Sequence, residues 1–529
     1  MARVINLCVF AIKFSVASAL SFLKLQGPPS LPPDASHRLH PSLASFSIET
    51  AFFEEFFGNL SAPNQLSLDL LENLHARTGV PAEVRIGGIT ADSTYWRPNQ
   101  TVSLVNFIDN AGALHNTTVG PDFWKSMTLL PKGTKIMMNL NLQDLDYQGT
   151  LAMARATFES LSPDQFDGFE TTLNLKTPQF QVGATVEDPL WPYNTPAANR
   201  QLSCVSALAA GANSGGVVKS CSEHTYQYSV CDPPRIAVAT LPNLVNHTRL
   251  ARYSSALRFC YYRLMWPELR FLDLWQPRIR AVREILGNDK FVIGEYNSVS
   301  CSGKDGVSNT FGQALWLLDT TLYGASLNIS RMYLHHGGPL ALQSRTQLNH
   351  GGLSFYDMWF PVQNLNGPIQ VFPAYSTYLF ITEALGFSRN LRIANLYPGR
   401  QANGSSITTE LGDTSAGQLV AYGFWDEDAP TSRSFPTKLA LLNLEIFNQT
   451  NTGARPSSQF DISAFRRDEK RPVRIRRLQA PGADVKGGNV TTWAGQIFST
   501  GKATGDLVEE TQRESTISLQ ASEAALVFL

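Results

Sequence analysis

The first 370 residues alternate short apolar runs with longer amphipathic stretches. Eight of the short runs have the length and composition of buried strands. Helix-like segments separate most of them, most clearly residues 149–161 and 311–322. The candidate strands are 44–49, 83–88, 135–142, 166–170, 179–184, a strand at or just before 221–228, 291–295 and 329–335. Eight strands alternating with helices predict an α/β fold of the (β/α)8 TIM-barrel type.

The connection between the fourth and fifth candidate strands departs from this pattern. Only eight residues, 171–178, separate Glu170 from Gln179. A parallel crossover that contains its helix needs at least about a dozen residues. We therefore expect the barrel to lack a helix at this point.

The pattern of apolar and polar residues changes after about residue 370. Short apolar runs separated by Gly, Pro, Asn and Asp indicate strands joined by turns. These runs are 407–411, 418–424, 438–444, 473–478, 515–520 and 524–529. They predict a C-terminal β-sandwich. The expected domains are a barrel over 20–385 and a sandwich over 386–529, with about 20–40 as a segment that could pair with the sandwich.

The seventh candidate strand ends on a carboxylate, Glu295, and Tyr296 and Asn297 follow it. A Glu at the end of a strand is most often solvated or salt-bridged. In a parallel barrel, however, active sites lie at the carboxyl ends of the strands. The polar neighbours and the helix-like run 311–322 favour a catalytic carboxylate at the barrel mouth.

The composition limits the kinds of partner that the protein is expected to bind. The 529 residues include 43 basic and 44 acidic side chains, so the charge balance gives no reason to expect nucleic acid or an anionic membrane surface as a partner. Charged residues make up 16% and aromatic residues 10% of the chain, which is common among secreted carbohydrate-active proteins. No later segment is apolar over the length that a membrane span requires.

The N-terminus and the sequons indicate secretion. Residues 4–14 are mostly apolar, and Ala17-Ser18-Ala19 fits a cleavage site, so 1–19 is read as a signal peptide rather than a buried strand. Sequons for N-glycosylation add to this interpretation. They lie at Asn59, Asn99, Asn116, Asn246, Asn328, Asn403, Asn448 and Asn489. The expected protein is an extracellular glycoprotein and a monomer.

The five cysteines after the signal peptide lack zinc-type spacing, and one or two disulfides are expected. Cys231 with Cys301 is one possible pair, because both follow candidate strands. Gly87-Gly88 lacks the spacing of a dinucleotide loop. We therefore expect neither a metal nor a cofactor.

Several motifs occur in an order that resembles the β-glucuronidases of glycoside hydrolase family 79, to which the heparanases are related. The resemblance runs from about Ser42 to the C-terminus, including Thr491–Gly495. Its motifs are Ala44-Ser45-Phe46-Ser47-Ile48-Glu49, Arg85-Ile86-Gly87-Gly88, Met138-Asn139-Leu140-Asn141, Phe169-Glu170 and Gly294-Glu295-Tyr296-Asn297. The resemblance implies a retaining glycosidase with two catalytic Glu residues, at the ends of barrel strands four and seven.

In this resemblance Glu295 matches the nucleophile, whereas the proton donor has no match. The family places the donor in a Phe-Glu-x-x-Asn-Glu-Pro segment, but Thr171-Thr172-Leu173-Asn174-Leu175 follows Glu170 here. Glu170 aligns with the first Glu of that segment and is a weak candidate for the acid/base, as are Glu187 and Asp188. Ile89 also stands where the family usually has Asn.

Other polar residues near the strand ends are candidates for sugar binding, although inward-facing polar residues also pack barrel interiors. They are Asn139, Asn141, His224, Tyr226, Tyr296 and His335. A glucuronate carboxylate needs hydrogen-bond donors, for which Tyr296, His335 and Gly337-Gly338 are candidates.

The expected function is hydrolysis of terminal β-glucuronosyl or 4-O-methyl-glucuronosyl residues from glycans outside the cell. Two alternatives follow from the missing donor: a glycan-binding paralogue without full catalysis, or a coding sequence that lacks an exon, with part of 249–274 as retained intron. A third is a heparanase-like endo-enzyme, against which the neutral charge balance argues.

Overall fold

The computed structural model describes residues 22–110, 113–142, 145–162, 165–169, 180–183, 203–231, 233–247, 250, 276–338, 352–396, 418–430 and 434–529. The expected signal peptide, the strand at 407–411, most of the 249–274 stretch, and Glu170, Glu187 and Asp188 lie outside these residues.

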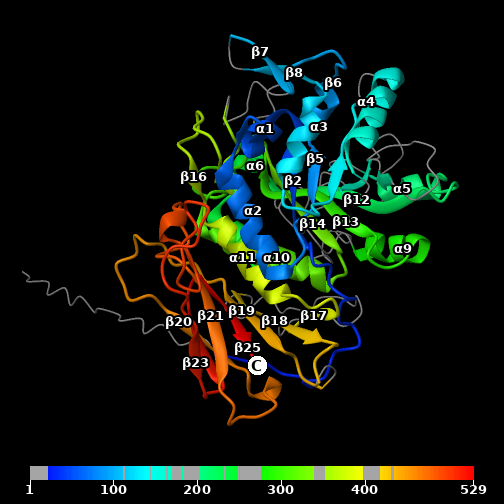
Figure 1. The fold of residues 1–529 in the computed structure, drawn as a ribbon. Coiled ribbons are helices and arrows are strands. Elements are labelled where there is room, and N and C mark those ends of the chain that lie inside the picture. The colour runs from blue at the N-terminus through cyan, green and yellow to red at the C-terminus, as the bar shows by residue number, and fades with distance from the viewer. Residues whose placement is uncertain are drawn as a thin grey trace, which may run out of the picture.

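Eight parallel strands form a closed barrel, with helices around it (Figure 1). Each predicted barrel strand contributes one of its members, so the predicted barrel is confirmed. In barrel order they are β10 (Phe166–Phe169), β11 (Phe180–Val182), β12 (Val218–Ser229), β13 (Phe291–Ser300), β14 (Arg331–His336), β2 (Ala44–Glu49), β5 (Val84–Gly87) and β9 (Ile136–Met138).

The barrel wall is weakest where the sequence predicts a missing helix. β10 and β11 meet at a single register position, with Phe169 opposite Phe180. By contrast, β12 and β13 pair from Cys221 opposite Phe291 to Ser229 opposite Ser300. The ten residues between β10 and β11, 170–179, lie outside the described part of the chain.

The helices around the barrel begin and end at residues that commonly cap helices, as α2 illustrates. In α2 (Gln65–Thr78), the Asn64 side chain accepts the Ser67 N–H at the N-terminus, and Gly79 adopts a left-handed conformation after the last turn. Its buried residues include Leu70 and Leu74, at the spacing of one helix face. The two predicted helices are α4 (Tyr147–Ser160) and α10 (Phe311–Ser326). The other long helices are α9 (Gln276–Leu286) and α11 (Ala374–Leu385).

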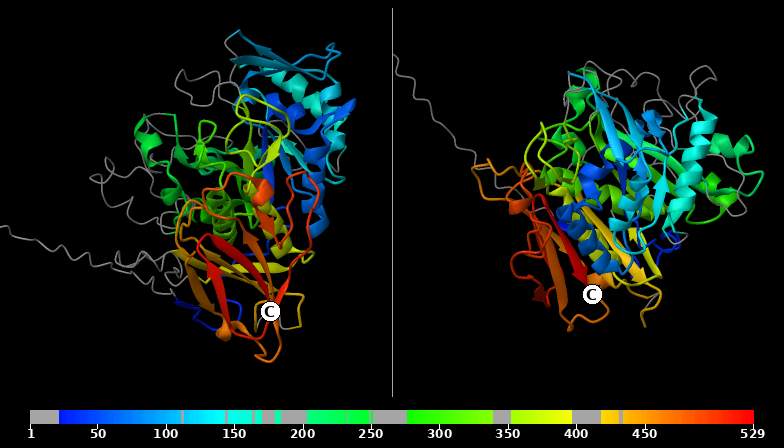
Figure 2. Two further views of the ribbon diagram at one scale, coloured as in Figure 1. Left: turned by 90° about the vertical axis from the view of Figure 1, so that its left-hand side faces the viewer. Right: turned by 45° about the horizontal axis from the view of Figure 1, so that its top comes forward.

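A small sheet that the sequence analysis does not predict follows β5. It consists of β6 (Thr94–Trp96), β8 (Leu114–Val119) and β7 (Leu104–Ile108), in that order. We call it the rim sheet, because it follows the carboxyl end of β5 and projects from that end of the barrel (Figure 2). Asn106 Nδ2 donates to the Ala51 carbonyl at 2.8 Å, which ties it to the segment after β2.

The C-terminal region is a β-sandwich, as predicted, and packs two sheets face to face. Its strands pair antiparallel except for β1 and β20, which are parallel. The larger sheet has the order β17 (Leu391–Asn395), β18 (Leu419–Asp426), β19 (Lys438–Asn443), β25 (Glu523–Phe528), β21 (Val473–Gln479) and β22 (Thr492–Trp493), with β23 (Glu510–Gln512) beside β21. The smaller sheet is β1 (Phe22–Lys24), β20 (Ser457–Asp461) and β24 (Thr516–Gln520). Residues 22–24 therefore belong to the C-terminal sandwich, although they begin the described chain.

Strand alternation connects the two regions. Leu419 and Ala421 of β18 belong to the sandwich core, whereas Val420 and Tyr422 belong to the core that includes α10 and α11. Figure 1 shows these two helices between the barrel and the sandwich. One face of the larger sheet therefore covers barrel helices and the other closes the sandwich.

A buried polar cluster crosses this interface. Asp319 on α10 lies 2.8 Å from His247 Nδ1, and Tyr422 Oη on β18 donates to Asp319 Oδ1 at 2.6 Å. All three side chains are buried. Because both partners depend on one carboxylate, its loss leaves two buried polar groups without that acceptor.

We expect Asp319→Ala to destabilise the protein strongly. Breaking a buried pair by removing one partner costs about 3–5 kcal/mol. Tyr422→Phe removes only one neutral donor and should cost about 1 kcal/mol. The thermal unfolding midpoints of the two variants measure this order. Equal midpoints for Asp319→Ala and the parent protein would contradict it.

Two disulfides join neighbouring segments of the barrel. Cys231 pairs with Cys301, with Cα atoms 5.5 Å apart, so this suggested pair is confirmed. Cys204 at the start of α5 (Cys204–Ala209) pairs with Cys221 on β12, a pair that the sequence did not indicate. Within the described ranges, no helix combines the length and hydrophobicity that crossing a bilayer requires.

Candidate active site

Glu295 lies inside the barrel because β13 contains a bulge. The register between β12 and β13 shifts between Glu223 and His224. As a result Ile293 and Tyr296 pack in the outer core while Glu295 turns inward, as expected of a bulge that redirects a side chain. Gly294 is the residue between them, and a Cβ there would come within 2.1 Å of Ser222 Oγ. Only glycine allows this close approach.

Two hydrogen bonds hold the carboxylate of Glu295. Arg85 Nη1 on β5 donates to Oε2 at 2.9 Å, and Tyr226 Oη on β12 donates to Oε1 at 2.7 Å. The Glu295 residue is 6% exposed. These donors stabilise the charged form and fix both oxygens in place.

Two histidines flank the same carboxylate. His224 Nδ1 lies 3.6 Å and His335 Nδ1 lies 3.8 Å from Glu295 Oε2. His335 Nδ1 is also 3.0 Å from Ser47 Oγ, which accepts a hydrogen bond from Arg85. Burial lowers the pKa of His224 to about 3, so its ring is neutral near neutral pH.

Burial alone would raise the pKa of the Glu295 carboxyl. The two histidines, Arg85 and Tyr226 act against burial and outweigh it, so the pKa lies below its usual 4.5. Burial raises the pKa of the Tyr226 hydroxyl well above its usual range, so it remains a donor. The site thus holds an ionised carboxylate, the form that attacks as a nucleophile.

A second carboxylate, that of Glu49, lies on the other side of His335 from Glu295. Glu49, at the end of β2, has its Oε1 atom 3.2 Å from His335 Nε2. Its oxygens also accept hydrogen bonds from the backbone N–H groups of Ile89 and Thr90. Gly88 has φ +77°, and a Cβ there would come within 2.3 Å of the Glu49 carboxyl carbon. The glycine turn therefore wraps around Glu49.

The predicted site residues do not all join this group. His224, Tyr226 and His335 surround Glu295, as described above. Asn139 lies beside Gly87 at the start of the rim, and its Oδ1 has no hydrogen-bond partner among the described residues. Asn141 instead donates to the Thr94 carbonyl at 3.4 Å, beneath the rim sheet.

Tyr296 points away from the barrel interior. Its side chain is fully buried, and its hydroxyl lies 3.2 Å from Thr321 Oγ1 on α10. The sequence analysis places it among the sugar-binding candidates because it follows Glu295. The bulge at Gly294 brings Glu295 inward, and the next residue then faces the helix layer. We therefore leave Tyr296 out of the binding residues.

Three further residues complete the site and were not among the candidates. Arg85 and Glu49 belong to motifs noted in the sequence but were given no role. Tyr356 comes from the segment after β14, and its ring centroid lies 6.2 Å from that of Tyr226 and 5.9 Å from that of His335. Asn297 Nδ2 donates to the carbonyl groups of His335 and Tyr356, at 2.9 and 3.2 Å. A strand-end position identifies Glu49, whereas Arg85 lies within β5 and nothing local in the sequence identifies Tyr356.

Comparison with known proteins finds sequence similarity in the C-terminal domain and over most of the chain. The family model for the "Glycosyl hydrolase family 79 C-terminal beta domain" matches residues 421–526. A β-glucuronidase of Aspergillus niger is 27% identical over 89% of this chain and 85% of its own length. A β-glucuronidase of Neurospora crassa is 24% identical over 94% of this chain and 91% of its own. The C-terminal domain therefore matches the family 79 model, and the chain as a whole is similar to these two β-glucuronidases.

Solved structures share the fold of this protein. A 4-O-α-L-rhamnosyl-β-D-glucuronidase from Fusarium oxysporum superposes with a TM-score of 0.70 at 21% identity, covering 96% of this chain and 100% of that one. An arabinofuranosidase structure covers 94% of this chain and 98% of its own, at a TM-score of 0.50 and 10% identity. These structures show a shared fold, a barrel with a C-terminal β domain. The likeness to β-glucuronidase-type glycoside hydrolases comes from the two sequence relatives.

The lowered pKa of Glu295 gives a prediction about pH. An ionised nucleophile is lost only when the pH falls through its folded-state pKa, which lies below 4.5. The rate of covalent inactivation by an activated 2-fluoro-glucuronide, which needs no proton donor, should stay constant from pH 7 to 4.5. In Arg85→Met, which removes a permanent positive charge, the acid limb should move upward. A limb above pH 4.5 in the parent protein would contradict the prediction.

Proposed function

We propose that this protein removes terminal β-glucuronosyl residues, with or without a 4-O-methyl group, from extracellular glycans with retention of configuration. The observation that carries the proposal is the ionised Glu295, held by Arg85 and Tyr226 inside the barrel. Glu295 attacks the anomeric carbon, and the bond to the leaving oxygen breaks as a glycosyl-enzyme forms. Water then releases the sugar and restores the carboxylate.

The surrounding residues have distinct roles in this proposal. Tyr226 and Arg85 position the nucleophile and return it to its ionised state after each cycle. His335 and Glu49 lie beside it with polar atoms that suit sugar hydroxyl groups. The unpartnered Oδ1 of Asn139 is a further acceptor for a hydroxyl. Support for the uronic acid itself comes from the relatives, which are β-glucuronidases.

No residue described in the structure is assigned here as the proton donor. Retaining enzymes place the second carboxyl about 5 Å from the nucleophile. Glu49 does not suit this role, because its oxygens already accept two backbone N–H groups. The predicted candidate Glu170 follows β10 and lies outside the described residues. Loss of a general acid lowers the rate by about two to four powers of ten.

Secretion is part of the same proposal. The disulfides Cys204–Cys221 and Cys231–Cys301 fit an oxidising compartment, in which such bonds persist. The predicted signal peptide and sequons point the same way. Secretion would bring the protein to glycans outside the cell.

The missing donor segment favours a second candidate, a protein that binds glucuronides without turning them over. Aryl β-glucuronides with good and poor leaving groups separate the two functions, because a good leaving group departs without protonation. The proposal expects hydrolysis of the activated glucuronide with the β-anomer as first product by NMR, and none of the matched β-glucoside. Binding by calorimetry without hydrolysis of either glucuronide would establish the second candidate.

A further inference from the structure

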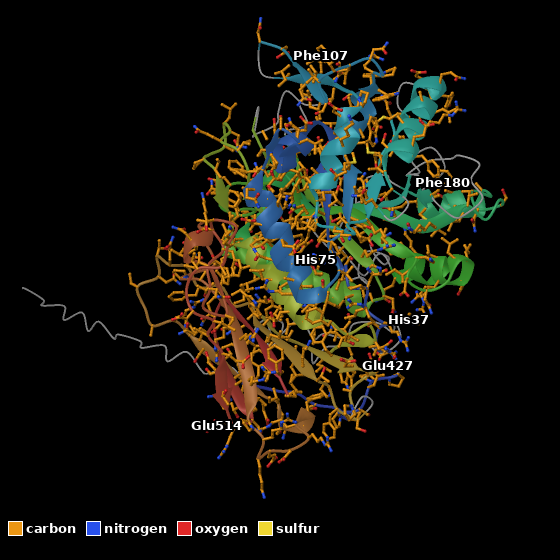
Figure 3. All side chains as sticks on the ribbon, viewed as in Figure 1. His37, His75, Phe107, Phe180, Glu427 and Glu514 are labelled. Carbon is orange, nitrogen blue, oxygen red and sulfur yellow. A yellow bond between two sulfur atoms is a disulfide. The ribbon has the colours of Figure 1, made fainter. Side chains whose placement is uncertain are left out.

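The outer strand of the rim sheet exposes large apolar side chains. Phe107 and Ile108 of β7 are 49% and 58% exposed, and β7 forms one edge of the sheet. Figure 3 shows Phe107 at the end of the molecule farthest from the sandwich. An exposed apolar edge strand is a site for unwanted pairing with other chains, which proteins usually cover or charge.

The residue directly across from Phe107 is an asparagine in a sequon. Phe107 is the register partner of Asn116 on β8, and Asn116-Thr117-Thr118 is one of the predicted glycosylation sequons. Cβ atoms of such cross-strand partners lie about 4.5–5.5 Å apart on the same face of a sheet. A group attached to Asn116 would therefore lie beside the Phe107 ring.

The pairing pattern shows on which face of the rim sheet Phe107 and Asn116 lie. The adjacent pair, Asn106 and Thr117, faces the barrel, because Asn106 Nδ2 donates to Ala51 and Thr117 Oγ1 donates to Asn106 Oδ1 at 2.7 Å. Neighbouring residues of a strand point to opposite faces. Phe107 and Asn116 therefore share the outward face.

We propose that Asn116 carries an N-linked glycan whose first N-acetylglucosamine packs on the ring of Phe107. In this modification Asn116 Nδ2 forms a bond to C1 of that sugar. The bond between C1 and a lipid diphosphate breaks, the amide nitrogen gives up one proton, and the lipid diphosphate leaves. The apolar face of the sugar covers Phe107, and the glycan shields the free edge of β7. The proposal rests on entry into the secretory pathway, which is part of the proposed function.

Glycopeptide mass spectrometry of the full chain, secreted from a eukaryotic host, tests the modification. Two other sequons provide internal controls, since Asn99 is exposed in a turn and Asn489 is exposed in a short 3-10 helix. Modification at Asn116 together with a control site supports the proposal. Modification of the control sites alone overturns it for Asn116. If no sequon of the secreted chain is modified, the proposal fails at Asn116. Appearance of the chain in the medium tests secretion separately, and activity on glucuronides is judged by its own assay.

The contact with Phe107 has a separate readout. Trimming the glycan to a single N-acetylglucosamine keeps the proposed contact, whereas Asn116→Gln removes it. Phe107→Ala should speed amide hydrogen exchange in residues 104–119 of the trimmed protein by about two- to fivefold, as loss of one cross-strand contact does. In the Asn116→Gln background the same change should have a smaller effect. An equal effect in both backgrounds would show that Phe107 acts without the sugar and would overturn the contact.

Discussion

Glu295→Gln should lower the turnover of an activated aryl β-glucuronide by about four to six powers of ten, as removal of a nucleophile does in other enzymes. Gln has nearly the same shape as Glu and still accepts hydrogen bonds through one oxygen. It has no negative charge with which to form the glycosyl-enzyme. Steady-state kinetics measure the loss, and mass spectrometry of the peptide containing residues 291–300 shows whether a 2-fluoro-glucuronosyl group attaches to the parent protein.

A matched control exists at the opposite end of the same barrel. Glu83 precedes β5 and, like Glu295, is a buried carboxylate that accepts hydrogen bonds from an arginine and a tyrosine. Arg331 Nη1 lies 3.1 Å from its Oε1 atom, and Tyr333 Oη donates to Oε2. Glu83→Gln should lower stability and leave turnover per folded molecule nearly unchanged. Equal losses of turnover in both variants would mean that Glu295 acts through the fold and not as a nucleophile.

The barrel was predictable because each of its strands combines apolar content with a clear boundary. β2 ends on the carboxylate of Glu49 and β5 on a glycine turn, which marks where these strands reach the mouth, whereas β13 continues past Glu295 to Ser300. The rim sheet was missed for the opposite reason. Leu104–Ile108 is a short strand with an exposed C-terminal end, and besides pairing with Leu114–Val119 it contacts the segment after β2. Such tertiary contacts leave no local periodicity.

The site was predictable in its centre and less so in its surroundings. The sequence places Glu295 at the end of its predicted strand, with His224 and His335 near the ends of theirs, so the three could be expected to meet. In the structure β13 and β12 continue past Glu295 and His224, to Ser300 and Ser229. The bulge at Gly294 could not be read from alternation, because a strict two-residue period places Glu295 on the side of Ile293. For the same reason Tyr296 was assigned to the site although it faces α10. Tyr356 reaches the site from a segment that follows β14, and only the fold brings it there.

The short β10–β11 connection affects both the topology of the barrel and the chemistry of the site. The connection between β10 and β11 is too short for the usual crossover helix, and the family's Asn-Glu-Pro is absent from the same place. β10 and β11 also make the weakest pairing of the barrel wall. A retaining site loses its acid when this segment is lost, while Glu295 on β13, the proposed nucleophile, keeps its own partners. The two halves of the mechanism are therefore separable by experiment.

Restoring the donor should raise the turnover of glucuronides with poor leaving groups by about two to four powers of ten, the usual contribution of a general acid. The triple variant Leu173→Asn, Asn174→Glu, Leu175→Pro recreates the family segment after Glu170 without changing chain length. Because an activated aryl group leaves without protonation, its rate should change much less. The dependence of kcat/KM on leaving-group pKa measures both effects in one series.

The matched control carries Asn174→Gln in place of Asn174→Glu, with the other two changes kept. It tests the shape of the segment without its acid, so a gain confined to the Glu variant assigns the effect to proton donation. Adding azide to the parent protein gives an independent check, since this anion attacks the glycosyl-enzyme without needing a base and releases a glucuronosyl azide. A rate for poor leaving groups that is the same in both triple variants would show that the shortened β10–β11 connection, and not the absent carboxyl alone, limits the reaction.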